Sequence, residues 1–147
     1  MCLVLIYFTT LLLMKLEFIY MFKKHQICEI LSVSKGTIPQ LPNFPEKIDS
    51  QYLSNLVLYR KDDVFTWLCN VINTREGCKH YQGEIEKERV IRLSELTVIL
   101  NVSKSHIYAQ VEKGHLPQPI KMGKRASGWL LSEVNEVLLQ SGLDEIV

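Results

Sequence analysis

Apolar and polar residues change their spacing several times between Arg89 and Gln140, and each change marks a short element. The run Val90–Leu93 suits a short, half-buried strand. Ser94 then offers a side-chain oxygen to the unpaired amides of a helix start, where Glu95 is also favoured. Helical spacing places three residues on one apolar stripe of this helix: Leu96, Ile99 and Leu100.

A second helix follows after a three-residue break at 101–103. Asn101 can adopt the left-handed conformation that ends a helix, and Ser103 can cap the next one. Gly114 is placed to stop this second helix. Its inward face contains Ile107 and Val111, while the spacing leaves Tyr108 either inward or exposed. Two helices joined by such a turn match the helix-turn-helix signature.

The next segment predicts a β-hairpin with a basic tip. Pro117 and Pro119 exclude a helix. Ile120 and Met122 alternate with Lys121, and the chain turns at Gly123-Lys124-Arg125 and returns through Gly128-Trp129-Leu130. A closing helix begins near Ser132 and Glu133 and has an apolar face formed by Val134, Val137 and Leu138. This order of elements is the plan of a winged helix-turn-helix.

The same pattern occurs earlier in the chain. KKHQICEILSVSKGTI, from Lys23, aligns with RLSELTVILNVSKSHI, from Arg92, and Tyr59 then aligns with Trp129. We therefore predict a mainly α protein with small β hairpins, built from tandem winged helix-turn-helix units. The first copy is degenerate, because Pro39 falls inside its second helix and its wing, KIDSQYLSNLVLY, lacks the Gly-Lys-Arg tip. Trp67 and Trp129 are expected in the core.

The predicted domains follow from this alignment. Residues 1–14 form an apolar leader of uncertain reality, 15–73 the degenerate first unit, 74–86 a polar linker with one possible helical turn, 87–141 the second unit, and 142–147 a tail. Each unit is short and buries only a modest core, so docking of the two units or dimerisation would stabilise both.

Three interpretations of the amino terminus stay open. A signal peptide would need positive charge before the apolar run, and residues 1–22 could anchor in a membrane only by burying Lys15 and Glu17. The interpretation we favour is a later start, at Met14 or Met21, or a poorly specified apolar leader on a cytoplasmic protein. Membrane anchoring is a minority alternative.

Charge and chemistry favour binding over catalysis. The formal net charge is only +1, but residues 89–140 contain seven basic and four acidic residues, so any nucleic-acid contact must be local. The four cysteines are scattered, which is typical of buried thiols in a reducing cytoplasm. Cys78 and His80 are at most half of a zinc site, and no catalytic motif is present. We therefore expect no metal, no cofactor and no enzymatic activity.

The second unit resembles the AlpA family of prophage regulators, relatives of the MerR-type winged helix-turn-helix and of phage excisionases. The resemblance rests on these positions: Arg92-Leu93, Leu96 to Leu100, Val102 to Ser105, Ile107-Tyr108, Gly114, Leu116-Pro117, Pro119 to Lys121, Gly123, Arg125, Trp129 and Ser132 to Val134. It implies a small DNA-binding regulator of a mobile element that activates or represses a promoter, or assists excision.

If the second helix enters the major groove, its exposed residues contact double-stranded DNA and the wing lies along the backbone. The expected contacts are Ser103, Lys104, Ser105, His106, Tyr108, Gln110, Lys121, Lys124 and Arg125. Weaker candidates in the first unit are Ser34, Lys35, Thr37 and Gln40. A homodimer or cooperative tandem binding on the nucleoid is compatible with this interpretation. The alternative from another class is a protein-interaction module that docks an integrase or RNA polymerase subunit.

Overall fold

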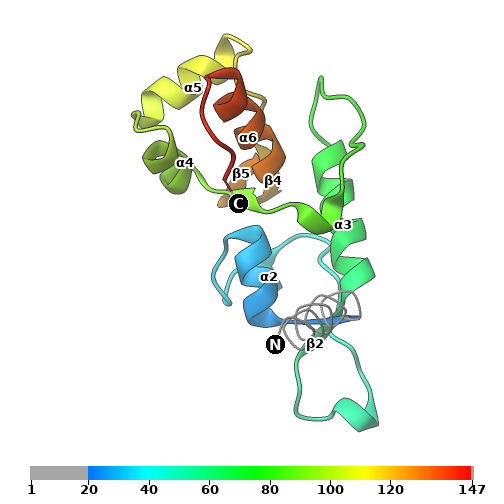
Figure 1. Ribbon diagram of the computed structural model, residues 1–147. Helices are drawn as coiled ribbons and strands as arrows, with labels where there is room; N and C mark the ends of the chain where they lie inside the picture. Colours follow the sequence, from blue (N-terminus) through cyan, green and yellow to red (C-terminus); the bar gives the residue numbers. More distant parts are fainter. Residues whose placement is uncertain (1–19, 147) are drawn as a thin grey trace, which may run out of the picture.

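The computed structural model describes residues 20–146, which form two packed units joined by a short connecting segment (Figure 1). The first unit contains β1 (Met21–Lys23), α2 (Lys24–Leu31), β2 (Leu58–Arg60) and α3 (Lys61–Asn73). The second contains β3 (Val90–Ile91), α4 (Leu93–Ile99), α5 (Lys104–Glu112), β4 (Ile120–Gly123), β5 (Ala126–Leu130) and α6 (Leu131–Gln140). Short 3₁₀ turns lie at Ile38–Gln40, Gln51–Leu53 and Ile85–Lys87. The fold is therefore mixed, with five described α-helices and small antiparallel sheets.

The two units repeat one strand pairing. In the first, β1 pairs with β2 so that Phe22 lies opposite Tyr59; in the second, β3 pairs with β5 so that Ile91 lies opposite Trp129. The helix that follows the first strand ends in both units with a left-handed residue, Ser32 at φ 49° and Asn101 at φ 51°. These equivalences coincide with the sequence alignment of the two copies.

The first unit lacks two elements that the tandem interpretation predicted. Where its second helix was expected, the chain forms only the 3₁₀ turn Ile38–Gln40 with Pro39 in its first positions. Proline has no amide hydrogen and its ring opposes a continuing helix, which explains the loss. In the expected wing, residues 47–59, the only strand is the start of β2, so no hairpin forms there. The first unit is thus not a complete winged helix-turn-helix.

A three-stranded sheet of order β3-β5-β4 lies between the cores of the two units. Alternation along β5 sends Ala126 and Leu130 to one face and Trp129 to the other. The first face, with Ile120 and Met122 of β4, completes the core formed by α2 and α3. The opposite face, with Ile91 and Trp129, packs on α4, α5 and α6. The hairpin of the second unit is therefore also part of the first unit's core.

In the second unit, the end of α4 and both ends of α5 follow the predicted signals, whereas the starts of α4 and α6 differ from them. Asn101 and Gly114 (φ 75°) both adopt left-handed conformations, as predicted. The prediction for Ser94 is wrong, because α4 begins one residue earlier and Ser94 falls inside its first turn without a capping bond. Ser132 likewise lies inside α6, where Glu133 takes the capping role by accepting a 3.1 Å hydrogen bond from the Leu130 amide.

Within residues 20–146 no helix combines the length and hydropathy needed to cross a bilayer. The predicted apolar leader, residues 1–14, lies outside the described part of the chain.

Candidate nucleic-acid interface

Helix α5 begins with a hydrogen-bonded N-cap and an exposed, polar first turn. The Ser103 hydroxyl accepts a 3.1 Å hydrogen bond from the His106 amide, which confirms Ser103 as the predicted cap. Lys104, Ser105 and His106 are exposed, while Ile107 behind them is fully buried. The helix is thus anchored on its inner face and presents its first turn to solvent.

Further along α5, the other two predicted contact residues have different surroundings. Tyr108 is 49% exposed, which settles its orientation in favour of the solvent side. Gln110 is half-buried, and its side-chain oxygen lies 2.8 Å from Nδ1 of His115. Its backbone oxygen also accepts the amides of His115 and Leu116. Gln110 therefore helps to hold the turn after α5.

The wing forms as predicted, with Lys124 and Arg125 exposed at the tip between β4 and β5. Arg92, at the start of α4, donates a 2.8 Å hydrogen bond from Nη2 to the backbone oxygen of Arg125. This bond ties the wing tip to the helix-turn-helix. Arg92 was not among the predicted site residues; its position directly before a helix was the available signal.

Lys121, the third basic residue of the wing, lies apart from the tip. It lines a different groove, between the wing and α3, together with Glu46 and Asp63. Acidic neighbours make that groove a poor surface for a polyanion. The structure therefore separates Lys121 from Lys124 and Arg125.

The candidates in the first unit lie close to the wing tip. Ser34, Thr37 and Gln40 line a groove of about 1100 Å³ whose opposite side is formed by Lys124 and Arg125. Lys35 is exposed on the same turn. No residue of α5 lines this groove. The structure thus groups the weaker candidates with the wing, while the first turn of α5 forms a separate exposed surface.

The basic candidates have no internal charge partner in the described chain. Among residues 20–146, Lys104, Lys121, Lys124 and Arg125 form no ion pair with an acidic side chain. Their charge is thus available to an external partner.

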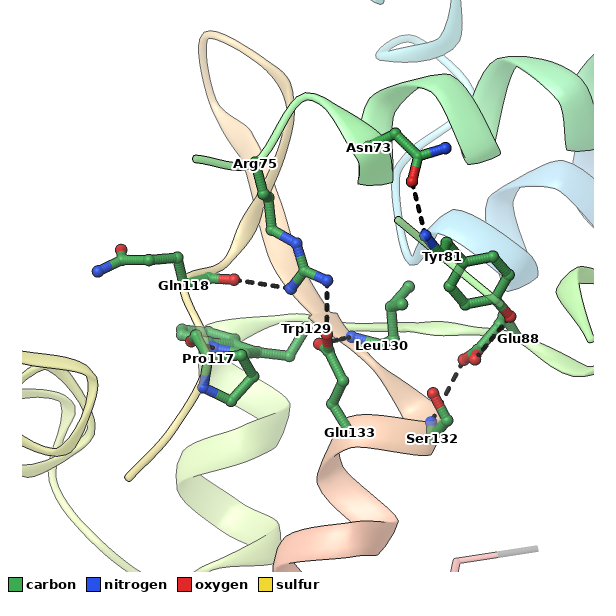
Figure 2. A network of polar contacts seen from close by, with 10 residues as sticks. All are labelled: Asn73, Arg75, Tyr81, Glu88, Pro117, Gln118, Trp129, Leu130, Ser132 and Glu133. Carbon is green, nitrogen blue, oxygen red and sulfur yellow. Dashed lines mark hydrogen bonds and ion pairs between the residues drawn. The ribbon is translucent and has the colours of Figure 1, made fainter. Parts of the chain in front are cut away.

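A largely buried polar network joins the two units (Figure 2). Arg75, which follows α3, forms a 2.6 Å ion pair with Glu133 of α6, and its Nη1 donates to the Gln118 carbonyl oxygen at 2.9 Å. Both partners lie around the wing and α6, so this contact fixes the end of α3 against the second unit. Figure 2 shows the guanidinium of Arg75 pointing toward both of them.

The connecting segment contributes a second set of contacts to the network. The Tyr81 hydroxyl donates a 3.0 Å hydrogen bond to the buried carboxylate of Glu88, whose other oxygen accepts the Ser132 amide at 3.3 Å (Figure 2). Burial raises the pKa of Tyr81, and the nearby negative charge of Glu88 and the hydrogen bond to it raise it further. Tyr81, in the segment predicted as a linker, is therefore connected to α6 through Glu88.

The candidate zinc ligands Cys78 and His80 are both exposed, and residues 20–146 contain no group of three or more side chains arranged to hold a metal ion. The first turn of α5 and the wing tip therefore offer hydrogen-bonding groups and positive charge.

The elements β3, α4, α5, β4, β5 and α6 together form a winged helix-turn-helix domain: two helices joined by a short turn, a basic hairpin and a closing helix. This domain is of the AlpA family, since residues 89–140 match the family described as "Prophage CP4-57 regulatory protein (AlpA)".

One similar protein is an uncharacterized protein of Enterobacteria phage P4, ORF88, which is 35% identical over 51 residues. The match spans 35% of this chain and 58% of the phage protein. No solved structure matches the chain.

Proposed function

We propose that this protein is a sequence-specific DNA-binding transcriptional regulator of a prophage or other mobile element. The observation that carries the proposal is the first turn of α5, where Lys104, Ser105 and His106 are exposed next to the Ser103 cap, while Ile107 anchors the inner face of the helix. A rigid helix that presents such residues suits the major groove, where side chains reach base edges. The AlpA match of residues 89–140 supports the same assignment.

In this mechanism the protein binds and does not catalyse. Lys104 contacts a phosphate or the guanine acceptors, and Ser105 and His106 approach base edges. The wing residues Lys124 and Arg125 neutralise neighbouring phosphates. Duplex DNA is the partner, in the cytoplasm on the nucleoid. One short recognition helix contacts only a few base pairs, so a homodimer or cooperative binding in tandem would lengthen the site that is read.

Selection of bound duplexes from a random pool tests the proposal directly. The full chain is incubated with the pool at low and at physiological salt, and bound fragments are sequenced over several rounds. We expect one enriched motif of a few base pairs. Binding without enrichment at both salt concentrations would overturn sequence-specific recognition, and no binding at low salt would overturn DNA binding altogether.

An excisionase-type role within the same class differs in the shape that the DNA takes. An architectural factor bends its site and binds in tandem, whereas a promoter regulator needs neither. Migration of circularly permuted fragments that contain the selected motif separates the two, because only a bent site changes mobility with position.

A second function, docking of an integrase or RNA polymerase subunit, is favoured by one specific surface. The loop before β2 exposes Tyr52 (87%), Leu56 (53%) and Val57 (42%). In Figure 1 this loop extends away from the rest of the molecule. Exposed apolar residues gathered in one loop are typical of a protein contact.

A further inference from the structure

The groove between the first unit and the wing tip has walls from two parts of the chain that are far apart in sequence. One wall consists of Ser34, Thr37 and Gln40, and the other of Lys124 and Arg125. Arg92 and Ser94, at the start of α4, also line it. The groove therefore exists only because the two units are packed together.

The lining of this groove is positively charged without acidic residues. Its charged residues are Arg92, Lys124 and Arg125. Two other grooves in residues 20–146 are different: Lys121 shares its groove with Glu46 and Asp63, and the groove beside Lys61 contains three glutamates. A cleft whose charged residues all have one sign attracts a ligand of the opposite sign, and no residue in it repels that ligand. Charge thus favours a polyanion here and not in the other two grooves.

The uncharged lining residues are those that bind phosphate oxygens. The hydroxyls of Ser34 and Thr37 lie 2.9 Å apart, so one of them keeps its own hydrogen free for an external acceptor. The Gln40 amide donates one hydrogen to the Gly36 carbonyl oxygen and has a second. Arg92 has five N–H donors, and its bond to Arg125 uses one of them. Hydroxyl, amide and guanidinium groups are the common partners of the DNA backbone.

The two walls are also held in fixed positions. Ser32, at the start of the first-unit turn, donates a 2.6 Å hydrogen bond to the Val90 carbonyl oxygen in β3. A Cβ placed on Gly123, in the wing, would be in ordinary van der Waals contact, at 3.6 Å, with side-chain carbons of Leu41 and Pro42, so the wing lies next to this part of the first unit. Such packing gives a preformed site, which loses less entropy on binding than a mobile one.

We propose that this groove binds the sugar–phosphate backbone of duplex DNA beside the half-site that α5 contacts. The inference rests on the proposed DNA-binding function and deepens it. The first unit has no recognition helix, yet it extends the footprint beyond the wing through contacts that are independent of base sequence. It therefore adds affinity and salt dependence while leaving the preferred motif unchanged.

The test compares two charge-matched double variants of the full chain, Ser34→Glu/Gln40→Glu in the groove and Ser54→Glu/Gln51→Glu in the exposed loop before β2. All four positions are at least partly exposed, and both variants add two negative charges. Affinity for the selected motif and for an unrelated duplex is measured across a salt series, together with hydroxyl-radical protection of the selected site.

We expect the groove variant to lose about tenfold or more in affinity for both duplexes, with a log K against log salt slope shallower by roughly 1 to 2, because each lost phosphate contact removes about 0.9. Protection should disappear at one flank only. The loop variant should retain the affinity, slope and footprint of the wild type.

Equal behaviour of both variants, with an unchanged footprint, would overturn the proposal. That result differs from failure of the proposed function, in which the wild type itself selects no motif. If circular dichroism shows the groove variant unfolded, the single variant Gln40→Glu, at an exposed position of the groove, replaces it, with Gln51→Glu as control. Gln40→Glu should then make the slope shallower by about 1, and an unchanged slope would overturn the proposal.

Discussion

Arg92 and Arg125, 33 residues apart in sequence, are joined by a 2.8 Å hydrogen bond from the guanidinium of the first to the backbone oxygen of the second. The bond uses backbone at the wing tip and leaves the Arg125 side chain exposed. It connects the residue before α4 with the turn between β4 and β5. The wing tip therefore has a defined position relative to the helix-turn-helix, which a hairpin held only at its base would not have.

Replacing the two basic residues at the wing tip should weaken binding to all DNA sequences alike. With about four to six phosphate contacts, the wild type should give a log K against log salt slope of roughly −4 to −5. Lys124→Ala/Arg125→Ala should make this slope shallower by about 2, since each phosphate contact accounts for about 0.9. Exposed Lys79 and Lys47 provide a control pair with the same loss of charge. Normal binding by the wing variant would show that the wing does not contact the backbone.

Replacing residues on the first turn of α5 should change which sequence is preferred. Ser105→Ala and His106→Ala remove groups that can bond to base edges, and each loss of discrimination should stay at or below the roughly 1–3 kcal/mol of a good bidentate base contact. Both side chains are exposed, so folding should be unaffected. Motif selection with each variant measures the change, and Val98→Ala, at a 78% exposed position on α4 outside the groove, serves as a control. An unchanged motif in both variants would exclude α5 as the reading element.

The second unit could be predicted from sequence because its signals are local. Asn101, Ser103 and Gly114 each act on the residues beside them, and the structure has each in the predicted conformation or bond. Pro117 and Pro119 exclude a helix without reference to any distant residue. The turn at Lys124 and Arg125 is likewise defined by its neighbours.

The remaining features depend on tertiary contacts that a linear pattern does not contain. Alternation indicated that Ile120 and Met122 would be buried, but not that the first unit would cover them. The resemblance between the two copies led to a second helix near Ile38, although Pro39 already weakened it, and the shared pattern was given too much weight. The Arg92 bond and the groove beside it arise from packing between units.

The ion pair of Arg75 and Glu133 should contribute much more to stability than an exposed one. The two side chains are only 9% and 19% exposed, so Arg75→Met leaves a carboxylate without its partner. We expect a loss of about 3 kcal/mol in the free energy of unfolding, reduced somewhat because the Nε of Arg75 has no partner in the described structure. Lys87→Met, which breaks the 2.7 Å pair with exposed Glu84, should cost less than about 1 kcal/mol. Urea unfolding of both variants measures the difference, and equal losses would contradict it.

The raised pKa of Tyr81 predicts a loss of stability at alkaline pH. In the folded protein, burial and Glu88 favour the neutral phenol, whereas in the unfolded chain the phenol ionises near its ordinary pKa of about 10. The stabilisation is therefore complete below that pH and decreases as pH rises toward the folded-state pKa. Thermal unfolding between pH 8 and 11 should show a steeper decline for the wild type than for Tyr81→Phe. Tyr59, whose pKa is also raised by burial, is the same in both proteins. Parallel curves would refute the assignment to Tyr81.

Gly128 should tolerate no side chain, because β5 approaches β3 closely at this residue. A Cβ there would lie 2.5 Å from the Ile91 backbone oxygen and 2.6 Å from a Val90 methyl group. Backbone atoms cannot move aside without breaking the pairing of β3 with β5, so Gly128→Ala should destabilise the protein by about 2–3 kcal/mol. Gly36 has no atom within 4 Å of the same added carbon, so Gly36→Ala should be neutral or slightly stabilising. The midpoints of urea unfolding of the two variants measure the difference in stability.

Because the sheet belongs to both cores, Gly128→Ala should lower the midpoint of a single unfolding transition. Two resolved transitions would show that the units fold independently.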